Sequence, residues 1–105
     1  MTVAEVRRIV ASREIGCIAP RIDAGAGPCR DRWGGEMPNA PRFLSLADGE
    51  MDYVRRGAIG RRHELPEDHA WLCHQHHVGT AAGRNWATSH REAMRAYLDG
   101  LAVPA

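Results

Sequence analysis

Three cysteines and a cluster of histidines constrain the folding of this chain more than any other feature. An odd number of cysteines cannot pair off completely into disulfides, and thiolates with imidazole are the ligands that tetrahedral zinc prefers. Cys73 and His76 have the Cys-x-x-His spacing of a knuckle that binds zinc from one turn. Cys17 and Cys29 are spaced more widely than the usual pair, so spacing alone does not show that they reach the same metal. The pattern predicts a structural Zn²⁺ ion, with three buried free cysteines as the alternative.

The short length of the chain makes such an ion useful. A chain of 105 residues forms one domain and buries only about two-thirds of its unfolded surface. Aromatic residues make up 6% of the sequence, so the core is thin and an additional cross-link is expected. We predict a single domain over residues 1–105, with its core at about residues 15–98.

Charge and hydropathy narrow the range of partners and locations. The formal net charge of +1 argues against a protein that coats nucleic acid by bulk electrostatics, although a local basic patch is compatible with it. No apolar run approaches the length of a transmembrane helix, and the segment Met1–Glu5 lacks the layout of a secretory signal. We therefore expect a cytoplasmic protein that is not secreted and has no membrane partner.

Helical patterns are strongest at the two ends of the chain. A Thr-x-x-Glu capping box opens an apolar repeat that predicts a helix over Thr2–Glu14. A Ser-x-x-Glu box opens a second repeat, which predicts a closing helix over Ser89–Leu101. The segment Cys17–Pro41 is rich in glycine and proline, which indicates a loop wrapped around the metal.

The middle of the chain contains two strand patterns and one further helix pattern. Phe43–Leu46 and Met51–Val54 are short strand candidates, and Asp48-Gly49 between them is a hairpin-turn signal. Pro66 suits the first turn of a short helix that continues to Cys73. These patterns predict a hairpin followed by a helix that carries the knuckle.

Several short motifs also follow one another in a definite order. They are an Asp-x-Val strand, a Pro-x-Asp segment, a Leu-Cys-x-x-His-His knuckle and a Gly-Arg-x-Trp segment, at Asp52–Val54, Pro66–Asp68, Leu72–His77 and Gly83–Trp86. Their order and spacing resemble those of small HNH endonucleases from actinobacterial phages, over Ile15–Leu98. The resemblance implies an α+β fold: a small zinc-stabilised ββα-metal domain with flanking N- and C-terminal helices.

The same resemblance implies hydrolysis of phosphodiester bonds in duplex DNA. Asp52 and His77 would bind a catalytic Mg²⁺ or Mn²⁺ ion, which neutralises charge on the scissile phosphate while a histidine accepts a proton from the attacking water. A separate structural zinc would be bound by Cys17, Cys29, Cys73 and His76.

The sequence departs from that family at two catalytic positions. Tyr53 stands where the family has its general-base histidine, and a phenol stays protonated at neutral pH. Loss of a positioned general base typically costs about 10²–10⁴ in rate. Asp68 stands where the family usually has asparagine, and it keeps an acceptor but loses the amide donors. The remaining histidines near the motifs are expected to be solvated surface residues, namely His63, His69 and His74.

Basic and aromatic side chains outside the motifs suggest contacts with partners. An arginine-rich loop follows the Asp-x-Val strand, where it would either bind DNA phosphates or remain a solvated loop. Its arginines are Arg55, Arg56, Arg61 and Arg62. Trp71 and Trp86 are expected in the core, whereas Trp33, in a glycine-rich loop, is the tryptophan expected to face a partner.

Three functions are compatible with these residues. The first is an HNH-type endonuclease weakened or inactivated by Tyr53. The second is a catalytically dead, zinc-stabilised phage protein that binds nucleic acid or a host or phage protein as a regulatory or assembly factor. The third is a small structural protein in which zinc serves folding only. The retained pair of Asp52 and His77 favours the first function, and Tyr53 favours the second.

Overall fold

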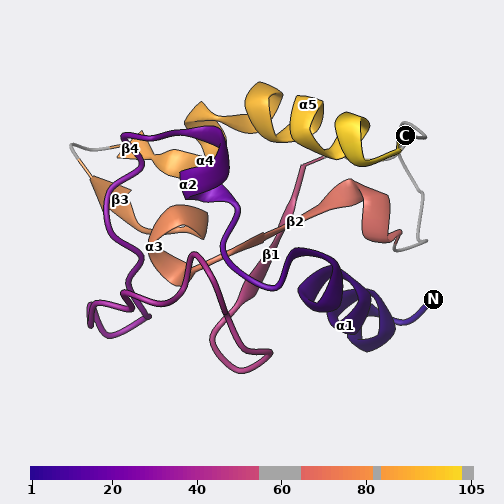
Figure 1. The fold of residues 1–105 in the computed structure, drawn as a ribbon, viewed down its shortest axis with the longest axis horizontal. Coiled ribbons are helices and arrows are strands. Elements are labelled where there is room, and N and C mark those ends of the chain that lie inside the picture. The colour runs from indigo at the N-terminus through magenta and orange to yellow at the C-terminus, as the bar shows by residue number, and fades with distance from the viewer. Residues whose placement is uncertain (55–64, 82–83, 103–105) are drawn as a thin grey trace.

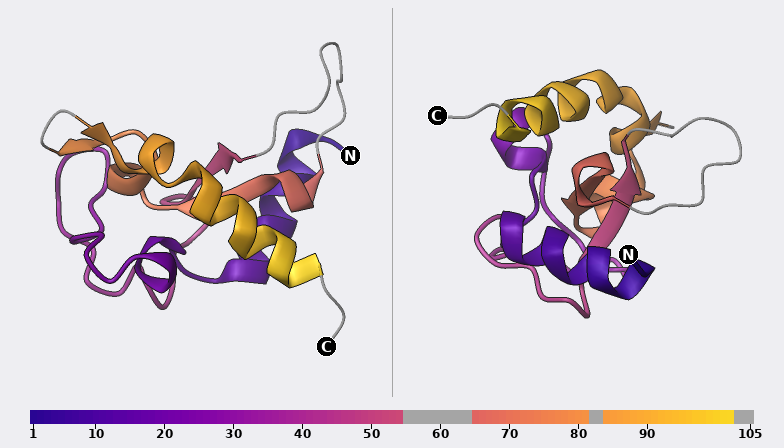
Figure 2. Two further views of the ribbon diagram at one scale, coloured as in Figure 1. Left: turned by 90° about the horizontal axis from the view of Figure 1, so that it is seen from above. Right: turned by 90° about the vertical axis from the view of Figure 1, so that its right-hand side faces the viewer.

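A pair of short antiparallel strands lies at the centre of the molecule, between two longer helices (Figure 1). This computed structural model describes residues 1–54, 65–81 and 84–102. The elements, in chain order, are α1 (Val3–Glu14), α2 (Ala19–Ile22), β1 (Glu50–Tyr53), the 3₁₀ helix η1 (Pro66–Asp68), β2 (His69–Leu72), α3 (His74–His77), β3 (Thr80–Ala81), β4 (Arg84–Asn85), α4 (Trp86–Ser89) and α5 (Arg91–Ala102). Figure 2 shows α1 and α5 on opposite sides of the β1–β2 pair.

Helix α1 begins with the capping box that the sequence predicts. The Thr2 hydroxyl accepts a hydrogen bond from the Glu5 backbone N–H, and the Glu5 carboxylate accepts one from the Thr2 N–H, each at 3.1 Å. Val6 and Val10 are fully buried in the core. One stripe of the helix therefore faces the protein interior, as expected for an amphipathic helix.

The central strands differ from the predicted hairpin. β1 pairs in antiparallel fashion with β2, and Asp52 stands opposite Ala70. The predicted pairing of Phe43–Leu46 with Met51–Val54 is wrong, because the first of these segments forms no strand. Pairing with β2 places β1 beside a fully buried strand, and the apolar surface buried in this way outweighs the local turn signal.

The segment that was predicted to continue as a helix after Pro66 forms a strand instead. Pro66 does open a helical turn, but this turn is η1 and it ends at Asp68. All four residues of β2 are buried, and a short, continuously buried run has no periodicity that separates a strand from a helix. Helix resumes only at α3, where Cys73 is the N-cap and its Sγ atom accepts a hydrogen bond from the His76 N–H.

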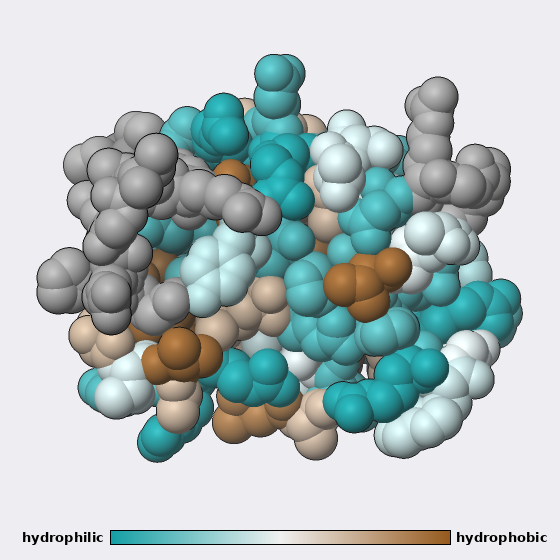
Figure 3. Space-filling view, turned by 180° about the vertical axis from the view of Figure 1, so that it is seen from behind, coloured by the Kyte–Doolittle hydropathy of each residue, from teal (hydrophilic) through white to brown (hydrophobic). Residues whose placement is uncertain are grey.

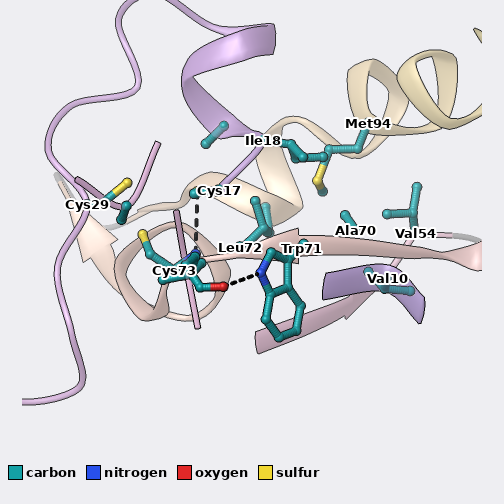
Figure 4. Close-up of a cluster of buried hydrophobic side chains, with 14 of the residues drawn as sticks. Val10, Cys17, Ile18, Cys29, Val54, Ala70, Trp71, Leu72, Cys73 and Met94 are labelled. Carbon is teal, nitrogen blue, oxygen red and sulfur yellow. Dashed lines mark hydrogen bonds between the residues drawn. The ribbon is translucent and has the colours of Figure 1, made fainter. Parts of the chain in front are cut away.

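Side chains alternate across the strand pair, so its two faces pack against different parts of the chain. Ala70 lies on the same side as Met94 of α5, whereas Trp71 points to the opposite side (Figure 4). The Trp71 indole is fully buried, and its Nε1 donates a hydrogen bond to the Leu44 carbonyl at 3.2 Å. Gly49 packs so closely on this ring that a Cβ added there would lie 2.0 Å from Trp71 Cζ2. Trp71 therefore holds the loop before β1 against the sheet.

A buried carboxylate joins the two long helices. Glu14, at the end of α1, is only 2% exposed and forms ion pairs with Arg13 at 2.8 Å and with Arg21 at 3.2 Å. The hydroxyl of Tyr97, from α5, donates a hydrogen bond to the same carboxylate at 2.6 Å. Burial, followed by the hydrogen bond with Glu14, raises the pKa of Tyr97. Because a buried charge is stable only when it is paired, this network fixes α1, α2 and α5 relative to one another.

The predicted closing helix is confirmed, with its start at Arg91 rather than at Ser89. The preceding residues form the separate short helix α4, whose Asn85 cap accepts a hydrogen bond from the Thr88 N–H. Met94 and Leu98 bury the apolar stripe of α5 in the core.

Polar side chains cover most of one face of the molecule. On the face turned away from the viewer in Figure 1, apolar side chains lie singly among polar ones (Figure 3), as is normal for a protein surface. Among the described residues, no helix has both the length and the apolar character needed to cross a membrane.

We expect Gly49→Ala to destabilise the protein, because the added methyl group overlaps a fully buried indole. The free energy of unfolding should fall by about 1–3 kcal/mol or more, the usual cost of overpacking a core. Gly100→Ala is the matched control, since a Cβ at that position in α5 meets nothing within 4 Å and alanine is the better helix former by about 1 kcal/mol. Urea denaturation of both variants beside the wild type measures the difference, and equal stability of the two variants would contradict the tight contact at Gly49.

Candidate metal centre

Four residues that are predicted to bind zinc meet at one buried point. Cys17 precedes α2, Cys29 lies in the loop after α2, and Cys73 and His76 belong to the start of α3. Cys29 and Cys73 lie close together at the end of β2 (Figure 4). All four residues are buried, and one ligand atom from each lies within 4.8 Å of the other three. Within the part of the chain that the structure describes, no other group of histidine, cysteine and acidic residues forms so close a set of three or more.

The spacing of these atoms fits a tetrahedral zinc ion. The Nδ1 atom of His76 lies 3.1 Å from the Cys73 sulfur and 3.7 Å from the sulfurs of Cys17 and Cys29. Bonds of about 2.3 Å to sulfur and about 2.0 Å to nitrogen place the two kinds of ligand about 3.5 Å apart in a tetrahedron. Three thiolates with one imidazole are the donor set of closed structural zinc sites. The centre can therefore hold a metal ion, and it is consistent with structural zinc.

Backbone groups orient the ligands of this centre. His76 Nε2 donates a hydrogen bond to the Ala26 carbonyl at 2.8 Å, so Nδ1, the nitrogen that faces the sulfurs, is the atom that can bind a metal once it releases its proton. The Cys73 N–H donates to Cys17 Sγ, and the His76 N–H donates to Cys73 Sγ, each at 3.4 Å. Hydrogen bonds to sulfur favour the charged thiolate, which is the form that binds metal.

Close contact among the four side chains changes the pKa values of Cys29, Cys73 and His76. Hydrogen bonds with Cys17 and Cys29 lower the pKa of the Cys73 thiol far below its ordinary value, whereas contacts with Cys17 and Cys73 raise the pKa of Cys29. Burial lowers the pKa of His76, but hydrogen bonds with Cys17 and Cys73 outweigh burial and raise it to about 10. Cys29 thus resists ionisation beside the Cys73 thiolate, and a divalent cation is the species that stabilises several thiolates together.

A second polar cluster lies on the strand pair and the adjacent helix. We call it the acid–histidine cluster, and it consists of Glu50, Asp52, His74 and His77. Glu50 accepts hydrogen bonds from His77 Nδ1 at 2.7 Å and from His74 Nδ1 at 2.8 Å, one on each carboxylate oxygen. The other ring nitrogen of His77, Nε2, lies 3.4 Å from Asp52 Oδ1. The structure thus brings together Asp52 and His77, while their binding of Mg²⁺ or Mn²⁺ stays a prediction.

The charge on Glu50 determines the orientation of His77. Partial burial raises the pKa of Glu50, but the hydrogen bonds from His77 and His74 outweigh burial, so that the net pKa is lowered. An ionised Glu50 accepts a hydrogen bond from His77 Nδ1, which turns the other ring nitrogen, Nε2, toward Asp52. A histidine held by a carboxylate in this way is the usual arrangement of a metal-binding imidazole.

The carboxylate of Asp52 is buried but not fully satisfied. Asp52 is 6% exposed, and its Oδ2 atom has no hydrogen-bond partner within the described parts of the chain. Arg91 lies 3.7 Å from Oδ2, and its guanidinium donates a hydrogen bond to the Tyr53 carbonyl. A buried carboxylate oxygen without a hydrogen bond is costly; the ion pair with Arg91 offsets part of that cost, and a bound cation would offset more of it.

The two other predicted catalytic residues are Tyr53 and Asp68. Tyr53 is the neighbour of Asp52 in β1, so its side chain lies on the opposite face of the strand. On that face its ring is paired with His69, with 4.4 Å between the ring centroids. Asp68 ends η1, immediately before β2. The catalytic roles of Tyr53 and Asp68 stay predictions.

The prediction that His69 and His74 are solvated surface residues is wrong. His69 is 1% exposed, because β2 is buried along its whole length, and its Nδ1 lies 2.7 Å from the Leu65 carbonyl. His74 is partly buried by its ion pair with Glu50. The remaining predicted contacts lie outside the described residues, namely His63, Arg55, Arg56, Arg61 and Arg62.

The sequence patterns did not identify two residues of this region, Glu50 and Arg91. Glu50 stands two positions before Asp52, and a strand with a period of two puts both side chains on one face, so the signal for Glu50 is present in the sequence. Arg91 reaches Asp52 only through the packing of α5, and no sequence spacing indicates that contact.

Comparisons of the chain with protein families, with curated proteins and with solved structures find no match. The functional argument therefore starts from the two clusters themselves. One of them is a closed set of thiolate and imidazole ligands, which suits a structural metal. The other presents an oriented imidazole beside a buried carboxylate, which suits a hard divalent cation bound through oxygen and nitrogen.

We expect the purified protein to bind one zinc ion per chain and to lose its far-ultraviolet circular dichroism when a chelator removes the ion, because small metal-bound domains fold with their metal. Cys73→Ser should weaken zinc binding by more than roughly 100-fold, since loss of even an outer partner costs about 10–100-fold. His74→Ala is the matched control, because His74 adjoins Cys73 but is bonded to Glu50. Competition titration with a chromogenic chelator measures both affinities. An unchanged dichroism spectrum after chelation, or equal losses in the two variants, would contradict this assignment.

Proposed function

We propose that this protein is an HNH-type, metal-dependent phosphodiester hydrolase that acts slowly on duplex DNA. The observation that carries the proposal is the 3.4 Å approach of His77 Nε2 to Asp52 Oδ1. Beside it lies a buried carboxylate oxygen that has no hydrogen-bond partner among the described residues. Together they offer one nitrogen and one oxygen ligand, with the remaining coordination positions open to water and phosphate, as Mg²⁺ sites usually require.

The arrangement of elements supports this proposal. β1, β2 and α3 form a strand–strand–helix unit, in which β1 provides Asp52 and α3 provides His77. The Cys17–Cys29–Cys73–His76 centre lies at the start of the same helix, where a structural zinc would hold the unit together. This division between one structural and one catalytic ion agrees with the ββα-metal interpretation of the sequence.

Each residue of the acid–histidine cluster has a distinct part in the proposed chemistry. Asp52 and His77 would hold the divalent cation, which when bound neutralises charge on the scissile phosphate and the leaving oxygen. Glu50 keeps the proton of His77 on Nδ1 and so keeps Nε2 available as a ligand. His74 bonds the second oxygen of Glu50 and fixes the orientation of that carboxylate.

Tyr53 supports a second candidate function, binding without cleavage. Its phenol replaces the general base of the HNH pattern, and its side chain lies on the face of β1 away from Asp52. Without a general base the rate falls by about 10²–10⁴, which leaves binding as the main activity. The protein would then be a catalytically dead, zinc-stabilised phage protein that binds nucleic acid or a host or phage protein.

We expect the zinc-loaded protein to bind one Mn²⁺ ion at Asp52 and His77, as measured by the loss of the free-ion electron paramagnetic resonance signal. Asp52→Asn should abolish this binding, and Glu50→Gln should weaken it by about 10–100-fold, because it disturbs the orientation of His77. Glu36→Gln is the matched control, since Glu36 is an exposed carboxylate paired with Arg30. Equal affinities of Glu50→Gln and Glu36→Gln would contradict the positioning role of Glu50.

The general-base hypothesis predicts that Tyr53→His raises the rate of plasmid nicking in Mg²⁺ or Mn²⁺ by about 10²–10⁴ over that of the wild type. This increase requires the new imidazole, at the last residue of β1, to turn toward the face that carries Asp52. Asp52→Asn in the Tyr53→His background should remove the gained activity. Nicking by the variant alone supports an HNH site disabled by Tyr53. Absence of nicking from both proteins, with zinc bound and Mn²⁺ not bound, would overturn the hydrolase proposal.

A further inference from the structure

An exposed tryptophan lies beside the acid–histidine cluster. Trp33 is 81% exposed, more than any other large hydrophobic side chain of the described residues. It lines a cavity of about 210 Å³ together with Asp48, Glu50 and His74. An exposed indole does not gain the free energy that burial of its apolar surface would give. Exposed tryptophans are typical of surfaces that contact a ligand or partner.

The loop that carries Trp33 is held in one conformation by its own hydrogen bonds. Asp31 Oδ1 accepts hydrogen bonds from the backbone N–H groups of Trp33 and Gly35, each at 2.9 Å. Gly34 has a φ of 83°, a left-handed conformation that glycine adopts without strain. Because the loop is already ordered, a ligand that stacks on Trp33 does not have to order it.

This loop is also tied to the metal centre. It begins directly after Cys29, whose carbonyl accepts a hydrogen bond from the Met37 N–H at 2.9 Å. The Arg30 carbonyl accepts a hydrogen bond at 3.1 Å from the N–H of Gln75 in α3. The position of Trp33 relative to His74 and Glu50 is therefore fixed by the same helix that carries His77.

The charges around Trp33 select the kind of ligand. The Arg32 guanidinium lies over one face of the Trp33 ring, 5.3 Å from its centre, so a base would stack on the other face and the guanidinium could bind the adjoining phosphate. The cavity itself is lined by the carboxylates of Asp31, Asp48 and Glu50, which repel a phosphate or an acidic peptide but accept hydrogen bonds from amino groups. A flat, neutral ring that bears an exocyclic amine fits this combination.

We propose that Trp33 stacks an unpaired nucleobase that carries an exocyclic amino group, such as cytosine, while Arg32 contacts the adjoining phosphate. This inference rests on the proposed function, because it places the base at the cavity lined by Glu50, the carboxylate that orients His77. It narrows the substrate to DNA with a short single-stranded stretch, such as a frayed end, a flap or a gap. Stacking of bases on exposed aromatic side chains is the usual basis of single-strand binding.

The test is the fluorescence anisotropy of labelled oligo(dC) and oligo(dT) of about eight nucleotides, within the usual site size of single-strand binding domains. The zinc-loaded protein is used without Mg²⁺ or Mn²⁺, so that binding is measured apart from cleavage. The two probes carry the same charge; cytosine has an exocyclic amine where thymine has a carbonyl, and thymine has an additional C5 methyl group. Oligo(dC) should bind at least about 5-fold more tightly than oligo(dT), the effect of one additional hydrogen bond.

Two variants separate stacking from general surface effects. Trp33→Leu should weaken binding of oligo(dC) by roughly 5- to 150-fold, the range for loss of one base–aromatic stack. Phe43→Leu is the matched control, because Phe43 is a 65% exposed aromatic residue that lines different cavities, and it should bind like the wild type. Zinc content and circular dichroism establish that both variants are folded.

The outcomes distinguish this inference from the proposed function. Equal affinities for oligo(dC) and oligo(dT), or an unchanged affinity in Trp33→Leu, would overturn the inference, even if Mn²⁺ binds at Asp52. Equal losses in Trp33→Leu and Phe43→Leu would overturn it as well. Binding that prefers oligo(dC) and depends on Trp33, in a protein that does not bind Mn²⁺, would support the stacking site and overturn the hydrolase.

Discussion

The packing of three sulfurs around the His76 imidazole is the interaction on which the rest of this structure depends. Cys17, Cys29 and Cys73 come from segments that share no regular element, and the thiols cannot all ionise beside one another without a cation. The segment between Cys17 and Cys73 includes the long irregular loop and β1, so a metal ion at this point closes most of the chain into one unit. In a domain with so thin a core, such a cross-link stabilises the fold more than any single side chain does.

The loop that carries Trp33 and the acid–histidine cluster are arranged around that centre. Cys29 begins the loop that carries Trp33, and Cys73 caps the helix that carries His77. The strand pair provides the carboxylates of Glu50 and Asp52 from the other side. Loops carry binding residues when a rigid scaffold positions them, and this loop is held by the residues of the metal centre and by a hydrogen bond to α3.

The sequence was most informative where chemistry or periodicity is local. The capping box of α1, the apolar stripe of α5 and the knuckle at Cys73 could all be predicted, because each depends on residues within a few positions of one another. Strand β2 could not be predicted in this way, because burial on both faces removes the alternation that identifies a strand. The contact of Arg91 with Asp52 could not be predicted either, since it depends on the packing of α5, a helix remote from Asp52 in the sequence.

Helix α3 is a single turn, yet it contributes to both clusters. His76 faces the sulfurs, whereas His74 and His77, three residues apart and so on one side of the turn, face Glu50. The two clusters are therefore coupled through one turn of backbone. Unwinding of α3 would separate His76 from the sulfurs and His77 from Asp52 in the same step. If the proposed hydrolase is correct, a change on β1 such as Tyr53 alters only the chemistry of the site, whereas loss of the four-ligand centre removes the support of both clusters at once.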